Sequence, residues 1–302
     1  MSSCSNLALS NLGQFCNFEV GEGKRILFQA LKKADGTLNY ISKAEAAEIA
    51  NWQTLFDKQN YDSDVLTKVV PTPIIFEMTP EIAEDVVFDQ AGYFKKIREG
   101  DYNLNFMVNE QSPYLIKQLK DMERRQIGFY VVDTLNQVIG KESGDNIYPI
   151  PLIRVSVGNF RLPSFETVNQ MPVTMRLVDP TDMNLLTSVT IADAQWDNDS
   201  DFYSLINVTG TVTSPAATGC TIAMVIDQTG DTGPTGLAFD DFTFVDQSDN
   251  SETTLAASGS LTESPDGTYT IDEASLLSAG TYTVKVEKDG YDFFIDDVVV
   301  SS

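Results

Sequence analysis

Alternating hydrophobic and polar positions run through most of the chain and predict a protein built mainly from β-strands. Near the end, Gly280 to Glu287 alternates β-forming with polar residues, turns at Asp289 and Gly290, and leads into Phe293 to Val300, which predicts a terminal β-hairpin. Four further strand-like runs after residue 205 are Ile206 to Thr213, Cys220 to Ile226, Leu237 to Val245 and Thr268 to Ile271. Their spacing is typical of a two-sheet sandwich of about six or seven strands.

The first two-thirds of the chain shows the same periodicity. Its strand candidates are Arg25 to Leu31, Pro73 to Met78, Tyr102 to Val108, Ile127 to Val132, Gln137 to Gly140, Leu152 to Phe160 and Val173 to Val178. Phe129 to Gly140 predicts a hairpin that bends at Asp133 to Asn136. Because the strands follow one another with few helices between them, we expect a strand-rich α+β body rather than repeating βαβ units.

Two helices are predicted in this body. Ser42 and Glu45 fit a capping box, and the apolar residues of one helical face follow them at Ala44, Ala47, Ile49, Trp52, Leu55 and Phe56. The second helix begins at Ser112 and Pro113, with proline at the first helical position, and ends at Gly128.

Composition and charge divide the chain in two. The 302 residues, with 42% hydrophobic and 21% charged residues, are ordinary for a folded protein of two domains. Residues 207–302 contain 2 basic and 16 acidic residues, hence 2 − 16 = −14, out of a net charge of −24. This shift predicts a domain boundary near Asp201 to Asn207, with a body over residues 1–206 and a sandwich domain over residues 207–302. So acidic a chain is unsuited to holding nucleic acid or an anionic membrane over its whole surface.

Two resemblances follow from these patterns. The last strands, with Pro265, Asp266 and Gly267 before Thr268 to Ile271 and with Gly280 to Val284, resemble bacterial and phage immunoglobulin-like domains. The antibody-type Cys-Trp-Cys pattern is missing, since Cys220 stands alone and no tryptophan follows Trp196. The helix at Pro113 to Arg125 between strands, the hairpin after it and this C-terminal domain together resemble the tail tube proteins of long-tailed bacteriophages.

The second resemblance implies a function. It implies a structural virion protein, assembled in the bacterial cytoplasm, whose subunits form stacked, hexameric rings with an outward immunoglobulin-like domain. Its partners would be copies of itself, other tail proteins, and DNA that passes through an acidic lumen without specific binding. A capsid decoration or neck protein is an alternative within virions, and a carbohydrate-binding or adhesive surface protein is an alternative of another class.

Catalytic chemistry is not indicated. The chain has no histidine, which removes the usual general base and the commonest transition-metal ligand. It also has neither of the two glycine-rich nucleotide-binding motifs. We therefore predict a protein that is not an enzyme, with no catalytic residues, cofactor or metal site.

Two short acidic motifs resemble functional sites, one of a protease and one of a Ca²⁺-binding loop. Asp231, Thr232 and Gly233 spell the aspartic protease tripeptide, but no apolar strand precedes them directly, and an exposed turn is predicted. Asp197, Asp199 and Asp201 begin like a Ca²⁺ loop, which then fails because Phe202 stands where glycine is needed and Val208 where the bidentate glutamate is needed. A solvated acidic linker is the favoured interpretation, and a Ca²⁺ ion at the domain junction is left open.

Three other groups of residues are interpreted structurally. The carboxylates between Thr79 and Asp89 are predicted to alternate with buried Ile82, Val86, Val87 and Phe88 rather than to form a glycosidase pair. Trp52 and Trp196 are expected in the core or at subunit contacts. The basic residues of the second predicted helix are expected to be exposed or to pair across a subunit contact, and these are Lys117, Lys120, Arg124 and Arg125.

The remaining expectations concern compartment and assembly. The first residues show no secretory signal, no apolar stretch reaches membrane-spanning length, and Cys4, Cys16 and Cys220 do not form a disulfide framework, so a reducing cytoplasm is expected. We further expect Asp57 to Lys68 and Gly140 to Tyr148 to be unstructured arms that reach a neighbouring subunit.

Overall fold

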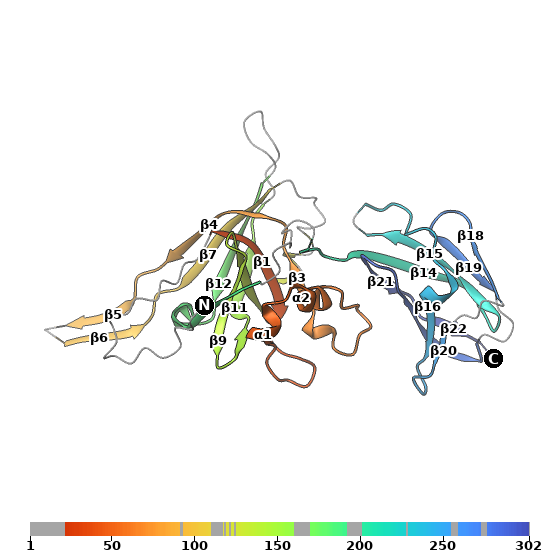
Figure 1. Cartoon of the computed structure of the whole chain (residues 1–302), viewed down its shortest axis with the longest axis horizontal. Coiled ribbons are helices and arrows are strands. Elements are labelled where there is room, and N and C mark those ends of the chain that lie inside the picture. Colours follow the sequence, from red (N-terminus) through yellow and green to blue (C-terminus); the bar gives the residue numbers. More distant parts are fainter. Residues whose placement is uncertain are drawn as a thin grey trace, which may run out of the picture.

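The computed structural model describes residues 22–90, 93–109, 117, 119–120, 122–123, 125–159, 170–191, 201–227, 229–254, 259–272 and 277–301. Within them the protein is mainly β, with few helices and with curled antiparallel sheets. Three parts follow one another along the longest axis (Figure 1): a two-stranded arm, a body and a C-terminal sandwich. No helix in the described part of the chain is long and apolar enough to span a membrane.

The body contains one sheet of eleven strands. They are β1 (Gly23–Ala30), β2 (Ile41–Ser42), β3 (Val69–Pro71), β4 (Ile75–Ile82), β7 (Tyr102–Asn109), β8 (Ile127–Asp133), β9 (Gln137–Ser143), β10 (Asn146–Tyr148), β11 (Ile150–Val157), β12 (Gln170–Leu177) and β13 (Leu186–Thr190). The main path runs β2-β10-β9-β8-β11-β12-β7-β4, while β1 joins β8 to β3 and β13 flanks β9. All seven strands predicted in the body are present, with ends shifted by a few residues.

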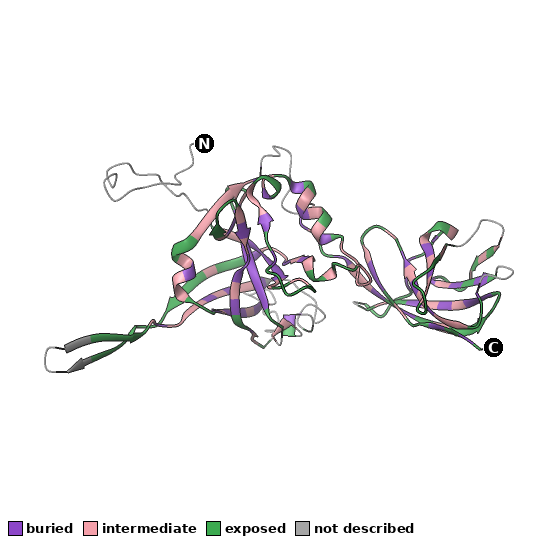
Figure 2. Cartoon of the chain, turned by 90° about the horizontal axis from the view of Figure 1, so that it is seen from below, coloured by how far each residue is buried: buried purple, intermediate pink, exposed green. Residues whose placement is uncertain are grey.

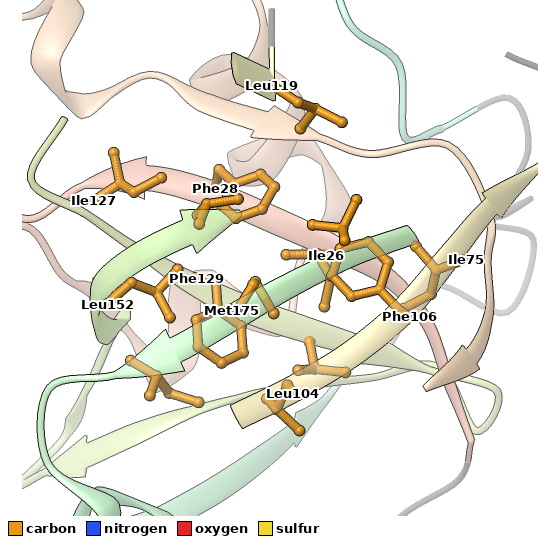
Figure 3. Close-up of a cluster of buried hydrophobic side chains, with 14 of the residues drawn as sticks. Ile26, Phe28, Ile75, Leu104, Phe106, Leu119, Ile127, Phe129, Leu152 and Met175 are labelled. Carbon is orange, nitrogen blue, oxygen red and sulfur yellow. The ribbon is translucent and has the colours of Figure 1, made fainter. Parts of the chain in front are cut away.

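The inner face of the curled sheet encloses the main hydrophobic core (Figure 3). Its large side chains come from β1, β7, β8, β11 and β12, and include Ile26, Phe28, Phe106, Phe129, Leu152 and Met175. Every residue of β8 is buried, because alternate residues face this core while Tyr130 and Val132 face a second core under the helices. Burial on both faces explains why this strand is an uninterrupted apolar run rather than an alternating one.

The second core lies between the sheet and two short helices, α1 (Lys43–Ala46) and α2 (Ile49–Phe56). The predicted capping box is present, since Ser42 Oγ accepts from the Glu45 backbone and Glu45 Oε2 accepts from the Ser42 backbone. The single predicted helix is wrong in detail, because the chain breaks at Ala47 and Glu48 before α2 begins. Trp52 lies fully buried against Tyr130, with ring centroids 5.3 Å apart, as expected of a core residue.

The described residues also contain short 3-10 helices, at Val65–Thr67 (η2), Pro180–Leu185 (η3) and Phe239–Asp241 (η4). The second predicted helix is seen only in part: Lys117, Leu119, Lys120 and Met122 are helical, and its start at Ser112 lies outside the described residues. The predicted body hairpin is confirmed, with Val132 opposite Val138 across the turn. The unstructured arm expected at Gly140 to Tyr148 is wrong, because β9 and β10 pair there.

The C-terminal sandwich consists of two sheets around a separate core. One sheet has the order β18-β19-β15-β14-β21 and the other β17-β16-β20-β22. The strands are β14 (Ile206–Ala216), β15 (Gly219–Ile226), β16 (Phe242–Asp246), β17 (Glu252–Thr254), β18 (Ser260–Glu263), β19 (Thr268–Asp272), β20 (Gly280–Val286), β21 (Tyr291–Ile295) and β22 (Val298–Val300). The expected sandwich is therefore present, with nine strands in its described residues rather than six or seven.

The predicted terminal hairpin is wrong. β20 and β21 follow each other through the turn at Gly290 but lie in different sheets, because β21 pairs in parallel with β14, and β20 pairs with β22. Asp296 and Asp297 break the run from Phe293 to Val300, and the Asp296 backbone donates to Gly210 while the chain crosses from one sheet to the other. The alternation of apolar and polar residues along β20 and β21 cannot show that the two strands pair with partners in different sheets.

Candidate interaction surfaces

A β-hairpin, β5 (Val86–Gln90) and β6 (Tyr93–Arg98), projects from the body at the end opposite the sandwich (Figure 1), and we call it the arm. Val87 lies opposite Lys96, and Phe88 lies opposite Lys95. Since neighbouring residues of a strand point to opposite faces, Val87 and Phe88 belong to different faces of the arm. They are 43% and 44% exposed, so both faces of the arm present apolar surface to solvent.

The burial predicted for this segment is therefore wrong. Ile82, Val86, Val87 and Phe88 are exposed, and so is Ile97, which is 61% exposed. Figure 2 shows the projecting arm in the colour of exposed residues where it is described. Val86, Val87 and Phe88 are consecutive in β5, so they do not alternate with carboxylates, and the sequence does not show whether anything packs on a two-stranded ribbon. An isolated hairpin is only marginally stable in water, and exposed apolar residues on both of its faces make the arm a candidate interaction surface.

Polar contacts fix the base of the arm. Asp85 accepts from Lys96 and from the Gly100 backbone, and Lys96 also binds Glu99. These hydrogen bonds, first from Lys96 and then from Gly100, hold the pKa of Asp85 below its usual range. A carboxylate kept ionised in this way positions the arm, and it is poorly suited to act as the general acid of a glycosidase pair.

A second surface joins the body to the sandwich. The body segment from Asp57 to Lys68 runs along β21, the edge strand of the five-stranded sheet. Gln59 Nε2 donates to Tyr291 O at 3.0 Å, and the Asn60 side-chain amide donates to Phe293 O. The prediction that this segment is an unstructured arm is wrong, because it is bound to the sandwich of its own chain.

An ion pair, a hydrogen bond and one cation–aromatic contact reinforce the junction. Lys68 Nζ lies 2.6 Å from Asp292 Oδ2, whose side chain is only 4% exposed, and Asp292 Oδ1 accepts from the Asn60 backbone at 3.0 Å. Lys285 Nζ lies 5.5 Å from the ring centroid of Tyr61. Burial, and then the nearby carboxylates of Glu287, Asp62 and Asp292, raise the pKa of Tyr61 far above its usual value, so this phenol is neutral.

A polar cleft of about 770 Å³ opens beside the junction. Tyr203 borders it and donates to both carboxylate oxygens of Asp57, and burial together with this hydrogen bond raises the pKa of Tyr203 to about 12. The other residues along the cleft are Gln59, Tyr61, Asp62, Leu205, Glu287, Lys288, Asp289 and Gly290. In the described ranges no group of acidic or cysteine residues is arranged to hold a metal ion.

The candidate catalytic motifs lie apart from these surfaces. Asp231 and Thr232 are exposed as predicted, but Gly233 is buried, and the segment pairs with β15 through a bridge between Thr232 and Val225 instead of forming a turn. Asp197 and Asp199, which begin the possible Ca²⁺ loop, lie outside the described residues, as does Trp196. A Ca²⁺ ion at the domain junction therefore stays an open alternative to a solvated acidic linker.

The predicted basic residues and the cysteines differ in their exposure to solvent. Lys117, Lys120 and Arg125 are exposed, as expected, while Arg124 lies outside the described residues. Cys220 is buried, and burial raises the pKa of its thiol to about 12, so it is not a reactive thiolate at neutral pH. Cys4 and Cys16 lie outside the described part of the chain.

Sequence reasoning missed the arm and the junction. One signal for the arm was present, since Tyr93 to Arg98 begins with two aromatic β-formers soon after the β-branched and aromatic run at Val86 to Phe88, with a glycine between the two runs at Gly92. No signal marks the junction, because its partners lie more than 220 positions apart in the chain. No known family model, curated protein or solved structure matches the chain.

Proposed function

We propose that this protein is a non-enzymatic structural subunit that assembles with copies of itself, and that the assembly is the tail tube of a long-tailed bacteriophage. The arm carries the proposal, because it exposes apolar residues on both faces where an isolated hairpin needs a covering partner. The virion location, the stacked rings and the passage of DNA belong to the same proposal, and they rest on the likeness of architecture stated above.

The favoured partner of the arm is a second copy of this chain. The arm is basic on β6, through Lys95, Lys96 and Arg98, within a chain of net charge −24. In the described structure Lys95 and Arg98 have no ion-pair partner, so carboxylates of a neighbouring copy are suitable partners for them. Closed rings also remove unpaired sheet edges such as β4, which is the last strand on the path of the body sheet.

The test is a pair of variants observed by negative-stain microscopy and light scattering. Ile97→Lys should convert rings or tubes into monomers, because it places a charge in the apolar face that the partner covers. Val299→Lys is the matched control, since Val299 is 55% exposed in the sandwich, far from the arm, and it should leave the assembly unchanged.

The same microscopy, together with a glycan array, distinguishes the tail tube proposal from its two alternatives. A wild-type protein that is monomeric or trimeric, and that Ile97→Lys leaves unchanged, would contradict the tail tube proposal and favour a decoration or neck protein. A monomer that binds defined oligosaccharides on a glycan array would favour the carbohydrate-binding alternative, with the tyrosine-lined junction cleft as the first place to look.

A further inference from the structure

The open edge of β21 and the body segment from Asp57 to Lys68 fit each other chemically. We propose that this segment is a cap on the sandwich: it closes the β21 edge against pairing with another strand and holds the sandwich in one orientation on the body. The inference does not depend on the proposed function, because it concerns contacts within one chain.

The first argument is hydrogen bonding along the edge. β21 is the last strand of its sheet, so one side of its backbone has no neighbouring strand. Carbonyl groups two residues apart, at Tyr291 and Phe293, point to that side and accept from the side-chain amides of Gln59 and Asn60. Two consecutive body residues thus take the acceptors that an added strand would use.

The second argument is the burial of Asp292. Asp292 stands between Tyr291 and Phe293, whose carbonyls accept the two side-chain hydrogen bonds. Its carboxylate side chain is only 4% exposed. A buried charge is tolerated only when it is paired and hydrogen-bonded, and both requirements are met by the cap, through Lys68 and the Asn60 backbone. A sandwich rotated away from the body would leave this carboxylate without either contact.

The third argument is the spread of the contacts. Tyr61 Oη lies 3.4 Å from Val286 O, on β20 of the opposite sheet, and the Tyr61 ring packs under Lys285. The cap therefore contacts both sheets of the sandwich, on either side of the turn that links β20 to β21. Contacts at two separated points restrict rotation, whereas a single covalent linker at residues 201–205 would not.

The experiment is hydrogen exchange measured by mass spectrometry on the full-length protein. The double variant Gln59→Ala with Asn60→Ala should make the amides of Tyr291 to Ile295 exchange about tenfold faster, because loss of the two side-chain hydrogen bonds to the Tyr291 and Phe293 carbonyls favours the local opening of β21 through which its amides exchange. Lys58→Met is the matched control, since the Lys58 ion pair with Asp64 lies within the cap itself, and it should leave β21 exchange unchanged. Equal exchange in wild type and the double variant would overturn the proposal.

A charge rescue tests the ion pair separately and covers the case in which the double variant fails to fold. Lys68→Met should speed β21 exchange because it leaves the buried Asp292 carboxylate unpaired, and adding Asp292→Asn should restore most of the protection by removing that charge. Small-angle scattering should show a broader distribution of sandwich positions for Lys68→Met alone. If Asp292→Asn does not restore the protection, or if the Lys68→Met scattering profile equals that of wild type, the cap does not hold the sandwich.

Discussion

Tyr130 shows at the residue scale how one polar group can order a distant loop. Its hydroxyl is buried between sheet and helices and donates to Gln29 Oε1 at 3.1 Å, while Gln29 Nε2 donates to Thr67 O at 2.7 Å. This short chain of hydrogen bonds ties the body sheet to the end of the cap. Burial raises the pKa of Tyr130 far above its usual value of 10.0, which keeps the hydroxyl a donor.

We expect Tyr130→Phe to lower the free energy of unfolding at pH 7 by about 1–2 kcal/mol, because Gln29 Oε1 is then left buried without its donor. Urea titration followed by circular dichroism measures the change. Tyr40→Phe is the control, because it removes the hydroxyl of an exposed tyrosine and should leave the free energy of unfolding unchanged. A stability equal to wild type would show that the bond contributes nothing.

The same residue gives a pH dependence with a definite sign. The native state keeps Tyr130 protonated above pH 10, where the unfolded chain loses that proton, so the native state binds more protons and stability falls as pH rises. The stabilising effect of Tyr130 is therefore complete below pH 10 and is lost above it, by about 1.4 kcal/mol per pH unit. Between pH 9 and 11.5 the stability of Tyr130→Phe should decline less steeply than that of wild type, and parallel curves would contradict this.

At the scale of elements, the arm depends on a close backbone approach at its base. A Cβ atom added to Gly100 would lie 1.8 Å from Ala83 O, so the two strands entering the arm are too close for a side chain there. Gly100 also donates its backbone N–H to Asp85, and Ala83 donates to Asp101. The glycine thus sets the direction in which the arm leaves the body.

We expect Gly100→Ala to abolish assembly while the melting temperature of the body falls only slightly, since the clash lies outside both hydrophobic cores of the body. Light scattering and circular dichroism measure the two effects. Gly280→Ala is the control, because its new methyl group would meet only ordinary contacts at 3.6 Å or more. Intact assembly of Gly100→Ala would mean that the direction of the arm is unimportant.

Elements also show what the sequence can and cannot predict. Strands such as β1, β8 and β12 follow from local alternation or from continuous apolar runs, and the Ser42 cap follows from a four-residue motif. Partners do not follow, because β21 joins β14 through hydrogen bonds between residues far apart in the chain. The exposure of Val87 was mispredicted for the same reason, since burial depends on what packs against the strand.

At the scale of the whole molecule, the sandwich and the arm lie at opposite ends of the body (Figure 1). Removal of the sandwich after Ser204 should therefore leave assembly through the arm intact. That truncation keeps Phe202 in the second core and the Ser204 hydrogen bond to Pro71 O. Microscopy should show the same rings, with a lower melting temperature because Lys68 and Asn60 lose their partners, and loss of all assembly would contradict the prediction.

The assembled ring should have an inner wall with more Asp and Glu than Lys and Arg. Residues 1–206 contain 18 basic and 28 acidic residues, and 18 − 28 = −10, so carboxylates remain in excess even if every basic residue is paired. A repulsive wall allows DNA to slide, because binding requires lysine and arginine contacts with phosphates. A density map of the ring gives the count, and a net positive inner wall or a ring without a channel would contradict both this prediction and the tail tube proposal.

The parallel pairing of β14 with β21 has a consequence for the order of folding during synthesis. Ile206 leaves the ribosome long before Tyr291, its partner, so the five-stranded sheet stays incomplete until Tyr291 to Ile295 have been made. The body strands have been made by then. Gln59 and Asn60 cannot form their hydrogen bonds to the carbonyl of Tyr291 and the carboxylate of Asp292 until these partners, 232 positions later in the chain, have been made. Nascent chains should therefore acquire a protease-resistant body first, and the sandwich should close and dock only once β21 has left the ribosome.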